Sequence, residues 1–158
     1  MYYFLILAAV GLDQLIKFFI RTNMEVHQTI PVIEDVFHIT YVQNTGAAFS
    51  MFSGHTSVLA VITIIATLAI LFYMHKVRNS AHSSLLWSLA LIIAGGIGNI
   101  IDRISLKYVV DFLDFRIWPV FNIADICVCV GCGLLIFYAF VIEPKLQKET
   151  DISKNENN

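Results

Sequence analysis

The chain has 158 residues, of which 58% are hydrophobic and 14% are charged, and its mean hydropathy is +0.74. This balance excludes a soluble globular domain and indicates an integral membrane protein. The formal net charge is −2 and no long basic run occurs, so the sequence indicates no nucleic-acid partner.

The first apolar run covers residues 1–20 and is long enough to cross a bilayer once as a helix, at about 30 Å. It lacks a basic start and a small-residue cleavage site, so we expect a retained span rather than a signal peptide. Asp13 and Lys17 lie four residues apart, on one helix face. Two interpretations are open: a local ion pair whose lysine reaches the membrane interface, or an inward-facing acid that supports a functional site.

The segment 23–55 is the longest that does not span the membrane. Its alternating pattern at 36–42 and the turn residues at 44–46 predict short strands in a small sheet at the membrane surface. The amide of Asn44 and the flexible backbone at Gly46 could hold an extended peptide or orient a carboxylate. The alternative is a simple turn back into the membrane.

Three further apolar runs follow, at residues 57–74, 85–101 and 120–142. Small residues that permit close helix packing lie in the second of these, at Ala94, Gly95, Gly96 and Gly98. The predicted fold is therefore an all-α membrane protein of four transmembrane helices, with a small extracytoplasmic β-rich segment between the first two. We expect a single domain over 1–142 and a charged, disordered cytoplasmic tail over 143–158.

Four spans place both termini on one side of the membrane and the segments 23–55 and 103–119 on the other. The polar residues at the span ends then gather near the second face: Asp13, Asn99, Asp102, Asn122 and Asp125. Lysine and arginine residues are equally numerous on the two sides. Excluding those that cluster with the acids places the termini in the cytoplasm and the site toward the extracytoplasmic face.

The stretch 98–125 carries four aspartates between two apolar runs, and ionisable residues at membrane depth indicate a functional site. Two carboxylates without a metal can hydrolyse an amide, because the ionised one takes a proton from water while the protonated one polarises the carbonyl. Asp111 and Asp125 are the candidate pair, since Asp125 opens the fourth span, where the positive helix end favours an ionised carboxylate.

The competing pair is Asp102 with Asp125. Asp102 is followed by Arg103 and shares a helix face with Asn99, which suits a supporting residue. Asp114 is interpreted as a solvated or interfacial acid.

Three cysteines, Cys127, Cys129 and Cys132, lie in the fourth apolar run. Their spacing and the absence of neighbouring ligands in the sequence favour small buried hydrophobic residues over a metal site. We therefore expect no metal and no cofactor.

Five motifs occur in order: DQLIK at 13–17, NTGAAF at 44–49, GNIIDR at 98–103, VVDF at 109–112 and FNIAD at 121–125. Their order over four spans resembles the bacterial lipoprotein signal peptidases (signal peptidase II), and the resemblance covers residues 1 to about 142. It implies an aspartic endopeptidase of the bacterial cell membrane that removes signal peptides from prolipoproteins before a diacylglyceryl-modified cysteine.

The resemblance makes Asp111 and Asp125 the catalytic pair. The residues that line or support the site would be Asp13, Lys17, Asn44, Gly46, Asn99, Asp102, Arg103, Asn122 and Ala124. Expected partners are diacylglyceryl-modified prolipoproteins, membrane lipids and globomycin-like cyclic peptide inhibitors, and we expect a monomer. An ion-coupled carrier would instead spread its acids through the membrane depth, and a scaffold protein would use them only in structural pairs.

Overall fold

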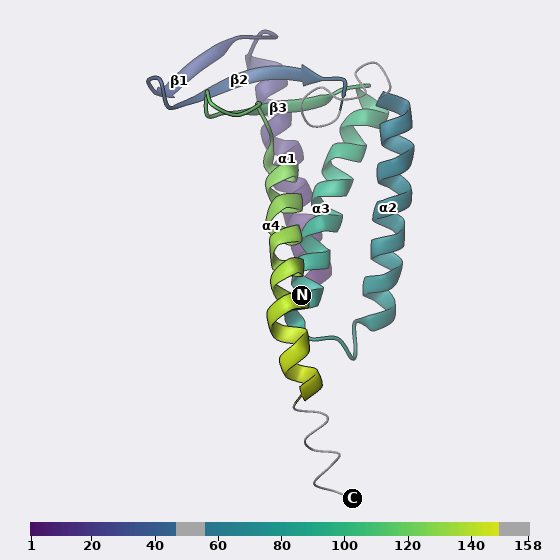
Figure 1. Ribbon diagram of the computed structural model, residues 1–158. Coiled ribbons are helices and arrows are strands. Elements are labelled where there is room, and N and C mark those ends of the chain that lie inside the picture. The colour runs from purple at the N-terminus through teal and green to yellow at the C-terminus, as the bar shows by residue number, and fades with distance from the viewer. Residues whose placement is uncertain (47–55, 149–158) are drawn as a thin grey trace, which may run out of the picture.

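The computed structural model describes residues 1–46 and 56–148, and four helices in these ranges are long and apolar enough to cross a membrane. They are α1 (Tyr2–Asn23), α2 (Thr56–Val77), α3 (Ser83–Ser105) and α4 (Ile123–Phe137), with α4 continued by the π-helix η2 (Tyr138–Ile142). Figure 1 shows a bundle with a small sheet at one end, and the start of α1 and the end of α4 toward the other. The predicted four-span fold is confirmed.

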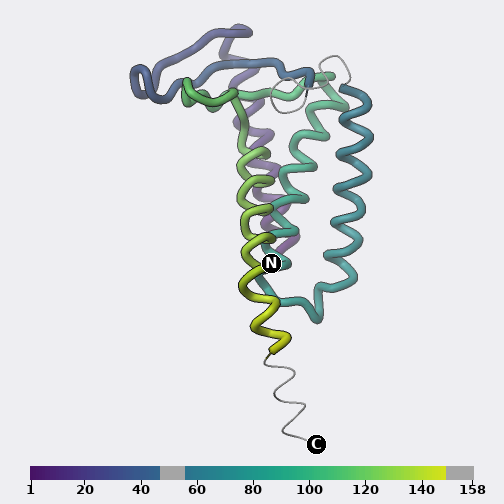
Figure 2. Tube along the Cα trace, viewed as in Figure 1, coloured from purple at the N-terminus to yellow at the C-terminus, as the bar shows by residue number. Residues whose placement is uncertain are grey.

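The sheet consists of β1 (Thr29–Ile33), β2 (Phe37–Asn44) and β3 (Val109–Asp114), antiparallel and in the order β1-β2-β3. The first two strands lie in the segment predicted to be β-rich, whereas β3 follows α3 and was not predicted. Pairing of β2 with β3 sets Val42 opposite Asp111 and Asn44 opposite Val109. The sheet therefore brings the 44–46 turn next to the aspartate-rich stretch, as the tube in Figure 2 shows.

Helix α3 is the centre of the bundle and packs against the other three helices. Close packing depends on its glycines: a Cβ at Gly95 would lie 2.2 Å from the Ala124 carbonyl oxygen, and one at Gly98 would lie 2.7 Å from Asp13 Oδ2. The predicted role of these small residues fits this geometry. Gly95 thus brings the backbone of α4 close to α3, and Gly98 leaves room for the Asp13 side chain of α1.

The C-terminal part of α4 differs from the prediction. The helix continues through Lys148, so residues 143–148 are ordered as helix and not as a disordered tail. Residues 149–158 of the predicted tail lie outside the described residues.

The prediction that the three cysteines are buried was also wrong. Cys127 is half-buried, and Cys129 and Cys132 are exposed on α4, all three as free thiols. The face of α4 that packs on α3 is marked by Gly131, which is buried. Since α4 is apolar on every side after Asp125 in its first turn, its sequence pattern does not distinguish the packed face from the lipid-facing one.

Two glycines of α4 give a matched test of this packing. A Cβ at Gly131 would lie 2.8 Å from the Ser88 carbonyl oxygen and 3.0 Å from the Ile92 nitrogen, whereas one at Gly133 would meet no atom within 4 Å. We expect Gly131→Ala to lower the thermal unfolding midpoint in detergent, because the backbone of α3 must move. Gly133→Ala should leave it unchanged or raise it, since alanine favours helix by about 1 kcal/mol. Equal shifts would contradict this packing.

Candidate active site

Asp111 and Asp125 are held together by one residue, Asn122. Its Nδ2 donates to Asp111 Oδ1 at 2.7 Å, and its backbone N–H donates to Asp125 Oδ2 at 3.2 Å. Its own Oδ1 accepts from the Asp125 backbone N–H at 2.9 Å, which completes a capping box at the start of α4. The structure thus brings the two aspartates of the predicted pair to the same asparagine.

The chain between Asp111 and Asn122 folds back on itself, which explains why the start of α4 lies close to Asp111. Phe121 forms a bridge with Leu113 of β3, and their backbone groups exchange hydrogen bonds of 2.8 and 3.1 Å. The chain therefore returns along β3 immediately before Asn122 starts α4. This turn places the first turn of the helix beside Asp111.

Asp111 is buried, with 2% of its surface exposed, and Oδ2 accepts from Asn44 Nδ2 at 3.0 Å. Burial and the nearby negative charge of Asp125 raise the pKa of Asp111 to about 7, against the opposing effect of hydrogen bonds from Asn44 and Asn122. Asp125 is half-buried and accepts from Asn99 Nδ2 at 2.8 Å. Near neutral pH, Asp111 can therefore carry a proton that it can donate.

Lys17 is the centre of a second cluster beneath this pair. Its ammonium lies 2.9 Å from Asp13 Oδ2, 3.0 Å from Asp102 Oδ2 and 3.1 Å from Asn99 Oδ1. Only 1% of its surface is exposed. The ion pair with Asp13 exists, but the lysine does not reach the membrane interface, so the geometry agrees with the supporting interpretation.

Asp13 and Asp102 each also bind the backbone of another helix or strand. Asp13 Oδ1 accepts from the Ala124 backbone N–H at 3.0 Å, and Asp102 Oδ2 accepts from the Val110 backbone N–H at 3.0 Å. Asp102 Oδ1 also accepts from Gln14 Nε2 at 3.0 Å. Asp102 is thus occupied by Lys17, Gln14 and Val110, which speaks against its pairing with Asp125. Our sequence reasoning missed Gln14, although it stands in the first motif.

Arg103 and Gly46 lie at the edge of the site. Arg103 Nη2 approaches the Gly46 carbonyl oxygen at 3.5 Å, and the Gly46 backbone N–H donates to Asn44 Oδ1 at 2.9 Å. The second bond fixes the amide so that its Nδ2 points to Asp111. Ala47, Ala48 and Phe49 of the same motif lie outside the described residues.

Asp114 was predicted to be a solvated or interfacial acid, and the structure contradicts the solvated alternative. It is 5% exposed and accepts from Thr40 Oγ1 at 2.7 Å and from the Arg116 backbone and guanidinium at 2.8 and 3.0 Å. Burial acts to raise the pKa of Asp114, but these hydrogen bonds and the arginine charge hold it below its ordinary value. The pairing of β3 with β2 places Asp114 opposite His38 and close to Thr40, which the local sequence does not reveal.

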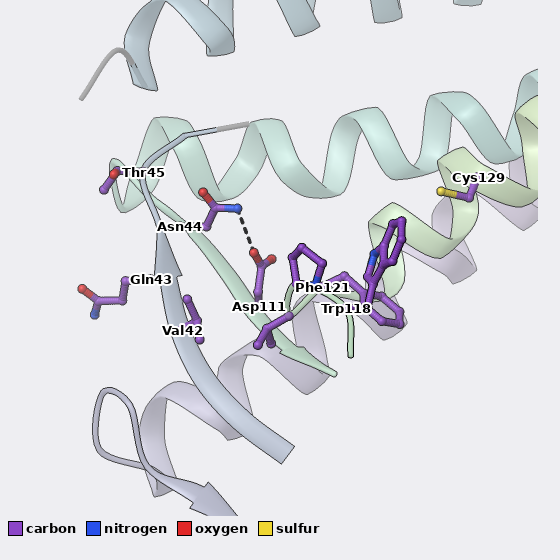
Figure 3. Close-up of a pocket in the computed structure, with 10 residues that line it drawn as sticks. Val42, Gln43, Asn44, Thr45, Asp111, Trp118, Phe121 and Cys129 are labelled. Atoms are coloured by element: carbon purple, nitrogen blue, oxygen red, sulfur yellow. Dashed lines mark hydrogen bonds between the residues drawn. The ribbon is translucent and has the colours of Figure 1, made fainter. Parts of the chain in front are cut away.

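Two cavities adjoin the aspartates. One, of about 340 Å³, is lined by Asn44, Asp111 and the 118–121 segment, and Figure 3 shows Asn44 pointing to Asp111 from its wall. The other, of about 540 Å³, is more apolar and includes Asp125 with Phe115, Ile126 and Val130. Their common lining residues are Trp118, Phe121 and Cys129. A substrate in either cavity therefore meets one of the two carboxylates.

A sequence model of the family described as Signal peptidase (SPase) II matches residues 5–141. The chain belongs to this family. A protein described as a lipoprotein signal peptidase from Halothermothrix orenii is 49% identical over 138 residues, covering 87% of this chain and 94% of that protein. Another so described, from Clostridioides difficile, is 41% identical over 147 residues, covering 92% and 98%. The predicted family and enzyme class, a signal peptidase II, are confirmed.

Solved structures agree with this assignment to signal peptidase II. Two that are described as bacterial membrane enzymes superpose with TM-scores of 0.82 and 0.79, each at 31% identity. The first covers 90% of this chain and 88% of that chain, and the second 89% and 92%. The membrane character predicted from composition is thereby confirmed. Among residues 1–46 and 56–148, no group of three or more His, Cys, Asp or Glu side chains could hold a metal ion.

Replacing Lys17 tests the buried charge cluster. In Lys17→Met, Asp13 and Asp102 remain buried without their cation, so we expect the peptidase to lose about 3–5 kcal/mol of stability. Lys76→Met is the control, because Lys76 is exposed at the end of α2. Unfolding in detergent, followed by tryptophan fluorescence, measures both. A loss in Lys17→Met no larger than in the control would show that the cluster is not a structural support.

The raised pKa of Asp111 predicts a pH-dependent stability. Folded Asp111 binds its proton with a pKa of about 7, whereas the unfolded side chain has about 3.9. The folded state therefore binds the proton more tightly, and stability falls as pH rises from about 4 to about 7. In Asp111→Asn this contribution is absent. Thermal unfolding of the two proteins across that range should show the parent losing stability relative to the variant, and parallel curves would contradict the assignment.

Proposed function

We propose that this signal peptidase removes signal peptides from prolipoproteins by hydrolysis before a diacylglyceryl-modified cysteine, with Asp111 and Asp125 activating water. The observation that carries the proposal is the pair of hydrogen bonds from Asn122, which hold two carboxylates together at the wall of a cavity. The names of the relatives, lipoprotein signal peptidase, support this class of substrate.

In this mechanism Asp125 is the general base. It sits in the first turn of α4, where the helix dipole and hydrogen bonds from Asn99 and the Asn122 backbone favour an ionised carboxylate. Asp111, with its raised pKa, supplies the proton. Water gives a proton to Asp125 as its oxygen attacks the scissile carbonyl carbon, and Asp111 protonates the carbonyl oxygen.

The tetrahedral intermediate then breaks down as Asp125 and Asp111 exchange roles, so that Asp125 donates a proton and Asp111 accepts one. Asp125 passes its proton to the departing amide nitrogen, and Asp111 recovers a proton from one hydroxyl as the new carboxyl group forms. The pair holds one proton before and after each turnover. Asn122 and Asn99 orient the two carboxylates throughout without supplying a charge of their own.

The surroundings of the pair fit a substrate that has a peptide part and a lipid part. Polar groups of Gln43, Asn44 and Thr45 line the smaller cavity, where an extended peptide can form hydrogen bonds. The larger cavity offers Phe115, Ile117, Trp118, Ile126 and Val130, a wall suited to acyl chains. Globomycin-like cyclic peptides are expected to inhibit by wedging between the two aspartates.

We further propose that both termini are cytoplasmic and that the active site faces the extracytoplasmic side, with the enzyme acting as a monomer. The positive-inside rule counts residues near loops. Lys17 is fully buried and Arg103 is half-buried beside the acids, so neither acts as a loop charge. Among the described residues, the remaining excess of basic residues lies at the end where α1 begins and α4 ends: Lys76, Arg78, Lys145 and Lys148.

Substitution of each aspartate tests the mechanism. With purified protein in lipid and a diacylglyceryl-modified prolipoprotein as substrate, Asp111→Asn and Asp125→Asn should each lower kcat/KM by about 10³-fold or more, because each removes a proton-transfer group. Asp114→Asn is the matched control from β3 and should retain turnover, since it lies outside both cavities. Turnover close to the parent level in either of the first two variants would remove that residue from the pair.

The same assay tests the substrate. The unmodified prolipoprotein, which lacks the diacylglyceryl group, should be cleaved far more slowly than the modified one. Equal cleavage of both would contradict recognition of the lipid, while leaving the two-aspartate mechanism in place.

A further inference from the structure

A groove at the other end of the bundle is not used by the site described above. Helices α1 and α2 both pack against α3 but have almost no contact with each other. Between them, where α1 begins and α2 ends, lies a groove of about 690 Å³. Its lining residues are Tyr3, Leu68, Leu71, Phe72, His75 and Arg78. Figure 1 shows this end of the bundle opposite the sheet that carries Asp111.

Hydrogen bonds order the mouth of the groove. Arg78 Nη1 is hydrogen-bonded to His75 Nε2 and donates to the His75 carbonyl oxygen at 3.1 Å. Because arginine only donates, Nε2 is the acceptor, and the neutral imidazole carries its proton on Nδ1. That Nδ1–H then donates to the Tyr3 hydroxyl oxygen at 3.1 Å. Tyr3 retains its own O–H proton, and the Arg78 guanidinium retains further N–H groups, as donors toward a ligand.

The charge around this mouth is positive. Lys76 lies two residues before Arg78, and residues 1–12 and 56–101 contain no aspartate or glutamate. Arg78 has no carboxylate within ion-pair distance among residues 1–46 and 56–148. Tyr3 and Arg78 line the same groove as donors, and a donor pair that includes a guanidinium without an acidic partner suits a phosphate group.

The length of the groove fits one leaflet of a bilayer. From Leu68 to Val77, its last residue, α2 rises about 14 Å, which is close to half of a hydrocarbon core of about 30 Å. Leu68 and Phe72 are 59% and 72% exposed and form an apolar wall toward the membrane centre, while Arg78 lies at the interface. A bound molecule would thus have an anionic head and a long apolar chain.

We propose that this groove is a binding site for an anionic phospholipid, with the phosphate held by Arg78 and Tyr3 and an acyl chain lying along Leu68 and Phe72. A zwitterionic lipid would bring its own ammonium group to an already cationic mouth and bind more weakly. The site is independent of the peptidase mechanism, because none of its residues lies near Asp111 or Asp125.

Thermal unfolding in a neutral detergent tests the proposal. Phosphatidylglycerol should raise the unfolding midpoint of the parent by about 4 °C more than phosphatidylcholine with the same chains at the same mole fraction. Arg78→Gln should abolish this difference. Lys148→Gln removes the same charge from an exposed position at the same end and should retain it. The compared quantity is the difference between the two lipids within each variant, so a change in intrinsic stability does not affect it.

A second pair of variants tests whether the acyl chain of the lipid lies in the groove. Leu68→Trp fills the groove and should also abolish the difference, whereas Ile65→Trp, at a 63% exposed position of α2 outside the groove, should not. Equal stabilisation of the parent by both lipids would overturn the proposal. So would equal effects of Arg78→Gln and Lys148→Gln, which indicate diffuse attraction, or a full shift with glycerol phosphate, which lacks the chain. A midpoint that rises with protein concentration and ignores the lipid would assign the groove to a second copy.

Discussion

The buried ammonium of Lys17 is the interaction on which the site depends. A cation without water at membrane depth is costly unless it is paired and fully hydrogen-bonded, and here Asp13 and Asp102 both neutralise it. Each acid also accepts a hydrogen bond from a backbone N–H of another element, Asp13 from Ala124 in α4 and Asp102 from Val110 in β3. The cluster therefore fixes, through one charge, the two elements that carry Asp125 and Asp111.

A layer of amides separates this cluster from the reactive pair. Asn99 accepts from Lys17 and Asn122 through Oδ1 and donates to Asp125 through Nδ2. Asn122 continues the layer to Asp111. Amides orient carboxylates without neutralising them, whereas a direct ion pair with lysine would lower the pKa of Asp111. The separation lets the lysine organise the site while Asp111 keeps a pKa of about 7.

Much of this arrangement could be predicted from the sequence, because a bilayer restricts the options. Apolar runs of about 20 residues must form helices, and counting them brings the ends of α1, α3 and α4 to one face. Some predictions failed because they concern residues whose structural partners are distant in the sequence. The third strand and the burial of Asp114 require pairing with β2, about 70 residues earlier in the chain, and Thr40 is the residue that shields the acid. The cysteines of α4 were misplaced because an all-apolar helix has no periodicity that marks its packed face.

The four helices do not contribute equally, and their packing explains why. Glycines on α3 let α1 and α4 approach near its C-terminal end, so Asp13 reaches the Ala124 backbone and Asn99 reaches Asn122. Helix α2 packs on another face of α3, where Thr67 covers Gly96. Its bond to the described site segment runs from Thr56 Oγ1 to the Thr45 carbonyl oxygen at 2.8 Å. Three helices thus build the charge network and α2 anchors the 44–46 turn. Helix α2 packs mainly on α3, and its far end meets α1 through the Tyr3–His75 hydrogen bond at the mouth of a groove that has room for a lipid chain.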